Sequence, residues 1–321
     1  MTRRLSTALA AALTLFSTLT ASAHASDKPA DKLTVMLEWF VNPDHAPLVI
    51  AKEKGYFAAE GLDVTLVPPA DPSSVPRLVA AGEADIGIHY QPNLYLDHAA
   101  GLPLMRIGTL VETPLNTLTV LKDGPIKSLA DLKGKTVGYS VAGFETALLG
   151  RMLANQGLTA DDVTMVNVNF ALSPSLIAGK VDATVGGFRN FELTQMAIEG
   201  HEGRAFYPEE HGVPAYDELI YVVDKTKLSD PRLPRFLAAV EKATIDLTNH
   251  PEEGLATFLK AYPDLDDRLN RQAFADTLPR FAKRPAALDT ARYRRFGAFM
   301  AESGLIDLAP AVEEIAVEVG R

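Results

Sequence analysis

Ala81-Gly82-Glu83-Ala84-Asp85 returns 97 residues later as Ala178-Gly179-Lys180-Val181-Asp182, and this repeated A-G-x-x-D pattern decides the fold class. In each copy a helical pattern leads into the alanine and glycine, and a short β-rich run begins at the aspartate. Asn93 follows the first copy and Asn190 follows the second, again 97 residues apart. A helix–glycine–strand unit that occurs twice predicts two lobes of similar construction.

Short β-rich runs alternate with helical patterns around both copies of the repeat. The first set comprises Leu33–Leu37, Ala46–Ala59, Val64–Val67, Ser74–Ala81, Asp85–His89 and Leu94–Ala100; the second comprises Lys135–Ser140, Phe144–Asn155, Thr164–Asn169, Leu172–Ala178 and Asp182–Gly186. Asp44, ahead of Pro47, fits an N-cap of the first helix. The alternation is typical of α/β proteins, so we predict a mainly parallel sheet in each lobe, covered by helices.

The last third of the chain lacks the strands for a third sheet. One β-rich run, Leu219–Val223, is followed by helical patterns at Leu233–Asn249, Pro251–Ala261, Arg271–Leu278 and Asp289–Ser303. We expect residues 32–115 to begin lobe 1, residues 116–216 to form lobe 2, and residues 217–321 to return to lobe 1. The chain then crosses near Glu112–Thr119 and near Val213–Tyr221, and two crossings make a hinge that permits closure around a ligand.

The amino terminus has the features of an export signal. Arg3 and Arg4 precede an apolar run from Leu5 to Leu19, and Ala23-His24-Ala25 supplies the small residues of a cleavage site. We expect residues 1–25 to be a cleavable signal peptide and the mature protein to be periplasmic. The chain contains no cysteine, which excludes a lipoprotein anchor, disulfides and thiolate metal sites.

Charge and motif content narrow the function classes. The formal net charge of −10 argues against nucleic acid as a partner. No nucleophile elbow, GxGxxG or P-loop sequence is present. His45, His89 and His98 lack the HExxH or paired-histidine spacing of a zinc site. We therefore expect a binding protein rather than an enzyme, with no cofactor and no metal.

The candidate site lies where the predicted strands end, because ligands of open α/β sheets bind beyond the carboxyl ends of the strands. The only tryptophan, Trp39, follows the first strand, and Tyr90 follows the third. Both could present flat faces to a planar ring, worth roughly 0.5–1.5 kcal/mol for each aromatic pair. Glu192 follows a Gly-Gly break, and its carboxylate could accept two hydrogen bonds from an amidine-like edge.

Further candidates surround these three residues. Asn42, Asn93 and Asn190 can each donate and accept, which suits either a heterocycle with mixed edges or an ordinary turn. Gly143 opens a helix whose free N–H groups could bind a ligand oxygen. The remaining candidates at the strand ends are His45, Tyr139, Glu145 and Arg189.

Several of these stretches resemble one known family. Met36–His45, Ala51–Phe57, Glu60–Val64, Gly82–Ile88, Leu129–Gly138 and Gly186–Glu192 are similar to the family shared by thiamin-pyrimidine-binding proteins and yeast-type hydroxymethylpyrimidine synthases. The resemblance implies a two-lobed periplasmic binding protein fold of type II with the ligand cleft at the hinge. The narrower patterns E-W-x-x-N-x-x-H and H-Y-Q-P-N resemble the formylaminopyrimidine-binding branch, whose members serve ABC importers.

For that branch the resemblance implies a pyrimidine ring between aromatic side chains, carried over to Trp39 and Tyr90, with a carboxylate, Glu192, at its amino edge. The expected ligand is a substituted aminopyrimidine, either formylaminopyrimidine or hydroxymethylpyrimidine. The expected protein partner is the membrane permease of an ABC transporter, and the receptor is expected to be a monomer.

The same resemblance leaves alternatives. A pyridoxal-dependent synthase would need a lysine and a histidine where this chain has His89 and Asn93, and a cysteine-rich run that is missing. Receptors for nitrate, sulfonates, taurine or riboflavin share the broader patterns. Arg189 stands where the branch often has tryptophan; it either faces the cleft and favours an acidic substituent, or pairs with Glu192 or Glu145.

Overall fold

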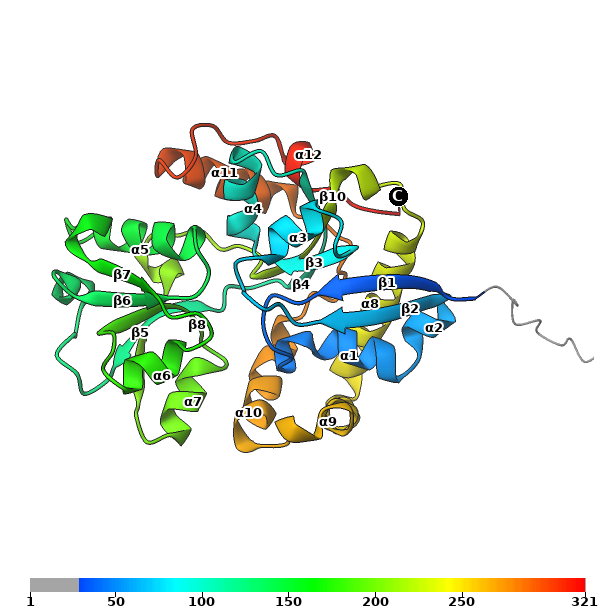
Figure 1. The fold of residues 1–321 in the computed structure, drawn as a ribbon, viewed down its shortest axis with the longest axis horizontal. Helices are drawn as coiled ribbons and strands as arrows, with labels where there is room; N and C mark the ends of the chain where they lie inside the picture. Colours follow the sequence, from blue (N-terminus) through cyan, green and yellow to red (C-terminus); the bar gives the residue numbers. More distant parts are fainter. Residues whose placement is uncertain (1–28, 321) are drawn as a thin grey trace, which may run out of the picture.

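The chain forms two lobes side by side, each built on one five-stranded sheet (Figure 1). This architecture is taken from a computed structural model that describes residues 29–320. The expected signal peptide, residues 1–25, lies outside the described residues. Within the described part, no helix has the length and apolar character needed to cross a membrane.

The two sheets have the same strand order. It is β2-β1-β3-β10-β4 in lobe 1 and β7-β6-β8-β5-β9 in lobe 2. The strands are β1 Asp31–Met36, β2 Leu62–Val67, β3 Ile86–His89, β4 Leu104–Val111, β5 Asn116–Leu121, β6 Thr136–Tyr139, β7 Thr164–Asn167, β8 Ala183–Phe188, β9 Gly203–Phe206 and β10 Leu219–Asp224. The predicted fold of two similar α/β lobes is confirmed.

Each sheet has a parallel core and one reversed strand. β1 pairs in parallel with β2 and β3, as β6 does with β7 and β8. β10 in lobe 1 and β5 in lobe 2 run antiparallel to both of their neighbours. The sequence patterns did not indicate β4, β5 or β9. All eight residues of β4 are buried, so this strand lacks the alternation that marks a half-exposed strand.

Helices cover both sheets. They are α1 Ala46–Glu53, α2 Tyr56–Ala59, α3 Val75–Ala80, α4 Gln91–Ala99, α5 Phe144–Ala154, α6 Leu172–Ile177, α7 Glu192–Ile198, α8 Arg232–Asn249, α9 Pro251–Ala261, α10 Arg268–Thr277, α11 Thr290–Glu302 and α12 Val312–Ile315. α10 begins at Arg268 rather than at the predicted Arg271, because the side chain of Asp267 caps it by accepting from the amide of Asn270 at 2.7 Å.

The repeated A-G-x-x-D units perform the same task in both lobes. The carboxylate of Asp85 accepts from the amide of Thr34 at 2.8 Å, and that of Asp182 accepts from the amide of Thr136 at 2.9 Å. Each aspartate therefore joins the strand that it begins to the central parallel strand of its sheet. Gly82 ends the preceding helix with a φ of 76°, a left-handed conformation that favours glycine.

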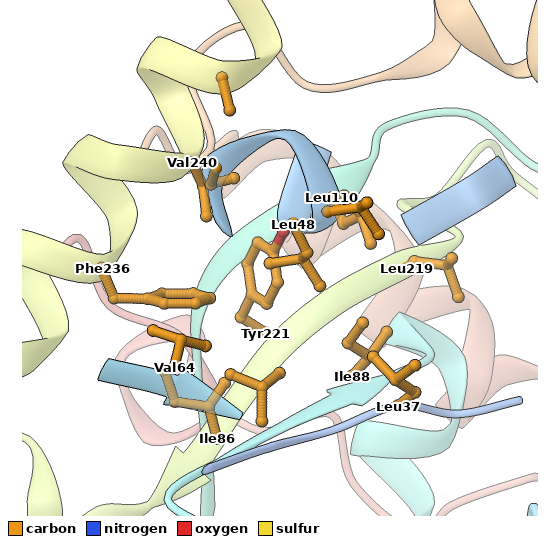
Figure 2. Packing of buried hydrophobic residues seen from close by; sticks show 14 of the residues in the cluster. Leu37, Leu48, Val64, Ile86, Ile88, Leu110, Leu219, Tyr221, Phe236 and Val240 are labelled. Atoms are coloured by element: carbon orange, nitrogen blue, oxygen red, sulfur yellow. The ribbon is translucent and has the colours of Figure 1, made fainter. Parts of the chain in front are cut away.

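The core of lobe 1 lies between the sheet and the pair α1 and α8 (Figure 2). Tyr221 of β10 packs edge to face against Phe236 of α8, with ring centroids 5.2 Å apart. On its other side Phe236 stacks on Phe57 of α2 at 5.5 Å. The helices after β10 thus return to lobe 1. Among them, α11 lies beside α4 (Figure 1).

The two crossings between the lobes are tied together by one buried carboxyl group. Glu218, which directly precedes β10, accepts from the amides of Leu115 and Asn116 at 2.5 and 3.0 Å. These two amides belong to the first crossing, between β4 and β5. Burial raises the pKa of Glu218 to about 7, although the two amide donors work in the opposite direction. The hinge is therefore a hydrogen-bonded pair of segments.

Phe236 provides a test of this core. Phe236→Ala removes a fully buried ring that joins α8 to α2 and β10, and we expect a loss of roughly 3–5 kcal/mol in the free energy of unfolding. Urea unfolding followed by circular dichroism measures it. Ile245→Ala on the same helix is the matched control, because this side chain is 44% exposed and its removal should change little. Equal losses from both variants would contradict the described packing.

Candidate functional site

A cavity lies between the two lobes and is lined by residues of both. Its lining comes from the carboxyl ends of strands and the segments that follow them, which is where the strand-end rule places a ligand. The lining residues are Glu38, Trp39, Asn42, Asp44 and Tyr90 of lobe 1, and Val141, Glu145, Leu172, Gly186, Phe188, Phe191 and Glu192 of lobe 2.

The two carboxyl groups from lobe 2 are held by backbone amides. One oxygen of Glu145 accepts from the amides of Ser140 and Val141 at 2.8 and 3.0 Å. One oxygen of Glu192 accepts from the amide of Phe188 at 2.5 Å. The hydrogen bonds from these three amides all end on Oε2, so Oε1 of each carboxyl group could accept from a ligand. Both groups are oriented acceptors before any ligand arrives.

The Gly-Gly break in β8 makes room for these carboxyl groups. A Cβ atom on Gly186 would lie 2.2 Å from Oε1 of Glu145, and one on Gly187 would lie 3.2 Å from Cγ of Glu192. Gly186 also has a φ of 105°, a backbone conformation that residues other than glycine rarely adopt. The break therefore serves the site by admitting two acidic side chains beside one strand.

Lobe 1 contributes two more carboxyl groups. Glu38 is buried, and both of its oxygens lie within 3.0 Å of Nε2 of His45. Asp44 accepts through Oδ1 from Nδ2 of Asn190 and from the hydroxyl of Thr277, both at 2.7 Å. Asp44 does not cap α1, whose first residue follows the 3-10 turn Pro43–His45; that turn is capped by Asn42, whose side chain accepts from the amide of Asp44.

Burial dominates the electrostatics of the cavity. It raises the pKa of Asp44 to about 6, against the hydrogen bonds from Thr277 and Asn190. It raises the pKa of Glu145 to about 8 and that of Glu192 to about 7, against their backbone donors. Burial works to lower the pKa of His45, but Glu38 outweighs it and raises that pKa overall. Among the described lining residues there is no lysine or arginine, so a ligand that brings hydrogen-bond donors is favoured.

Aromatic rings from both lobes form the apolar part of the wall. Trp39 packs edge to face against Phe170, with ring centroids 4.6 Å apart, and Tyr90 packs in the same way against Phe188 at 6.5 Å. Each pair joins a ring of lobe 1 to a ring of lobe 2. The cavity thus combines flat apolar surfaces with acidic acceptors, as a planar heterocycle with amino groups requires.

The cavity brings together five of the residues singled out in the sequence: Trp39, Asn42, Tyr90, Glu145 and Glu192. The other six lie outside its lining. His45 lies behind Glu38, and Tyr139 packs on the core of lobe 2. Asn93 donates across the lobes to the carbonyl of Ala142 at 3.2 Å, with Gly143 close to its side chain, and Asn190 donates to Asp44.

Arg189 faces away from the cavity and pairs with neither of the expected partners. Its guanidinium bonds Glu209 at 2.5 and 3.0 Å and the carbonyls of Leu115 and Asn116 in the first crossing. It also lies 4.3 Å from the ring centroid of Tyr207. Glu209 belongs to the 3-10 turn Pro208–His211, which packs beside the hinge. The arginine therefore supports the hinge; it is not among the described residues that line the cavity, and its carboxylate partner is Glu209 rather than Glu192 or Glu145.

Sequence reasoning missed seven lining residues: Glu38, Asp44, Val141, Leu172, Gly186, Phe188 and Phe191. Five of them stand beside or between residues that were singled out, so adjacency was the available signal. Glu38 and Asp44 are buried acids, and a sequence gives no direct sign that an acid next to a strand end is buried. Within residues 29–320, no three histidine, aspartate or glutamate side chains are placed to hold a metal ion.

Known proteins share this chain's sequence over most of its length. A family model described as NMT1/THI5 like matches residues 42–254. A Haemophilus influenzae protein named for thiamine biosynthesis is 51% identical over 90% of this chain and 92% of its own. The formylaminopyrimidine-binding protein of Halalkalibacterium halodurans is 34% identical, covering 73% of this chain and 71% of its own. A hydroxymethylpyrimidine phosphate synthase of Aspergillus parasiticus is 28% identical, covering 83% of this chain and 82% of its own.

Solved structures share the fold at low sequence identity. A Candida albicans protein described as having the generic periplasmic binding protein fold superposes with a TM-score of 0.70 and 16% identity, covering 90% of this chain and 97% of its own. The alkanesulfonate-binding protein SsuA of Xanthomonas axonopodis superposes with a TM-score of 0.69 and 18% identity, covering 89% of this chain and 97% of its own. The two lobes thus have the periplasmic binding protein fold, and the chain belongs to the NMT1/THI5-like family.

Proposed function

We propose that this protein is the periplasmic solute-binding protein of an ABC importer and that it binds a thiamin pyrimidine precursor, formylaminopyrimidine or hydroxymethylpyrimidine. The observation that carries the proposal is the cavity between the lobes, lined by four carboxyl groups and by aromatic rings from both lobes. The 34% identical relative that is named for binding formylaminopyrimidine supports the choice of ligand.

The chemistry of a 4-aminopyrimidine matches this lining. Its exocyclic amino group donates hydrogen bonds, and its neighbouring ring nitrogen can take up a proton beside a carboxylate. Glu192 and Glu145 each have one oxygen held by the backbone and the other free to accept from such an edge. The flat faces of Trp39 and Tyr90 would cover the ring.

The same lining disfavours anionic ligands. A sulfonate, nitrate or phosphate would need cationic or amide donors, but Arg189 is already engaged by Glu209. An anion beside Glu145 and Glu192 would also be repelled by any carboxyl group that is ionised. We therefore propose that the receptor takes the unphosphorylated pyrimidine and excludes its phosphate ester.

Binding without catalysis also fits the residues at hand. A pyridoxal-dependent synthase needs a lysine amine for its Schiff base, and no lysine lines the described cavity. His89, where that lysine would align, bonds Asp97 at 2.7 Å instead. The chain contains no cysteine for an iron-dependent step. We propose a monomeric receptor that is exported by residues 1–25 and delivers its ligand to a membrane permease.

Calorimetry on the purified protein tests the ligand. Formylaminopyrimidine or hydroxymethylpyrimidine should bind with a stoichiometry of one, because the two lobes together form the cavity that holds the four carboxyl groups. Hydroxymethylpyrimidine phosphate, taurine and an alkanesulfonate should give no binding heat at the same concentrations. Absence of heat with both pyrimidines, or saturable binding of the anions, would overturn the proposal.

Glu192→Gln tests the role of the acidic edge. The change replaces an acceptor that carries charge with a neutral amide, and we expect roughly 10- to 100-fold weaker pyrimidine binding. Glu199→Gln, an exposed position just after the same helix, is the matched control and should leave affinity unchanged. Calorimetry gives both values. A Glu192→Gln protein that folds and keeps full affinity would remove Glu192 from the site.

The pH dependence of stability tests the buried carboxyl groups together. Asp44, Glu192 and Glu145 have folded-state pKa values of about 6, 7 and 8, above their ordinary values. The stability that they contribute is therefore complete below about pH 4 and is lost as the pH rises through these values. The melting temperature of ligand-free protein should fall from pH 5 to pH 8.

Formylaminopyrimidine should reduce that fall, because its donors replace the lost protons, so it should raise the melting temperature more at pH 8 than at pH 5. Glu145→Gln should flatten the profile of the ligand-free protein at its alkaline end. An equal ligand effect at both pH values would show that the carboxyl groups do not meet the ligand.

A further inference from the structure

Asp44 differs from the other three carboxyl groups of the cavity because only one of its two donors, Thr277, belongs to its own lobe, whereas the other belongs to lobe 2. Glu145 and Glu192 are held by amides of their own lobe, and Glu38 is held by His45 of its own lobe. Asp44 stands in the turn before α1 in lobe 1, yet its Oδ1 accepts from Nδ2 of Asn190, which precedes α7 in lobe 2. This bond joins the two lobes directly.

The contact is desolvated and shared by three side chains. Asp44 and Asn190 are each 2% exposed, and Thr277 at the end of α10 is fully buried. Nδ2 of Asn190 lies 2.7 Å from Oδ1 of Asp44 and 2.6 Å from the hydroxyl of Thr277, which itself donates to Asp44. A hydrogen bond to a charged group in such surroundings is stronger than one in water, so its loss on opening is costly.

The second oxygen of Asp44 is left for the cavity. The hydrogen bonds from Asn190 and Thr277 both end on Oδ1, and within the described residues no side chain donates to Oδ2. Because Asp44 also lines the cavity, one carboxylate has an oxygen on the bridge between the lobes and an oxygen available to a ligand donor.

We propose that Asp44 is the positioning residue that couples occupancy of the cavity to closure of the lobes. This inference rests on the proposed function. A ligand donor on Oδ2 orients the carboxylate so that Oδ1 meets Asn190, and closure in turn holds Oδ2 toward the ligand. By thermodynamic linkage, the factor by which the Asn190 contact raises ligand affinity equals the factor by which the bound ligand raises the equilibrium constant for closure through that contact.

The coupling is tested by a double-mutant cycle on Asp44→Ala and Asn190→Leu, with formylaminopyrimidine as the probe. Asn190→Leu alone should weaken binding about tenfold, mostly through faster dissociation, because it removes a bond of the closed state. In the Asp44→Ala background the same change should cost less than about twofold. If Asp44→Ala does not fold, Asp44→Asn replaces it.

Asn93→Leu is the matched control, since Asn93 makes another buried contact across the lobes but does not line the cavity. Its effect should be additive with Asp44→Ala. Closure is read separately from a label pair at Glu53→Cys and Glu199→Cys, both exposed and unique because the chain has no other cysteine. Asn190→Leu should shift the labels toward the open distance in the presence of the pyrimidine.

Additive effects of Asp44→Ala and Asn190→Leu would overturn the coupling, as would non-additivity of the same size with Asn93→Leu. Absence of wild-type binding to formylaminopyrimidine would instead overturn the proposed ligand. The bond between Asp44 and Asn190 is then tested by the label distance in ligand-free protein. Asp44→Ala and Asn190→Leu must each increase this distance, and the double variant must not increase it further. Unchanged distances would reject the role of this bond in closure.

Discussion

The structure of the site depends on one constraint, which is that four carboxyl groups lie in one poorly solvated cavity. Burial favours the neutral form of a carboxyl group, and it raises the pKa values of Asp44, Glu145 and Glu192 above their ordinary range. Each group is nevertheless held in place by a fixed donor. A cavity of this kind is unfavourable when empty and ionised, and it is completed by protons or by a ligand that supplies N–H groups.

The fold provides the conditions for such a site. Two sheets of identical strand order point the ends of their parallel strands at each other, and the loops there supply acids and rings from both sides. The positive charge of Arg189 is neutralised at the hinge rather than in the cavity, because its guanidinium bonds Glu209 and the carbonyls of the first crossing. Glu218 joins the two crossings, so the two segments of the hinge are held together.

Local patterns predicted much of this architecture, since the A-G-x-x-D repeat reflects a real duplication of strand–helix units. Trp39, Tyr90 and Glu192 could be singled out because strand ends are recognisable from the sequence. The sequence indicated β10 as a strand but not its reversed direction, because that direction follows from the crossings. Asp44 resembled a helix cap, and its actual partner, Asn190, is far away in the sequence. The partner of Arg189 likewise depends on how a 3-10 turn packs beside the hinge.

The central claim is that the cavity binds the amino edge of a pyrimidine through the carboxyl groups of lobe 2, while rings from both lobes cover the pyrimidine. A crystal structure of the protein with formylaminopyrimidine tests it most directly. The account predicts the ring between Trp39 and Tyr90, with its amino group within hydrogen-bonding distance of Glu192 or Glu145 and Asp44 in contact with Asn190. A pyrimidine bound elsewhere, or turned so that its amino edge meets no carboxyl group, would contradict it.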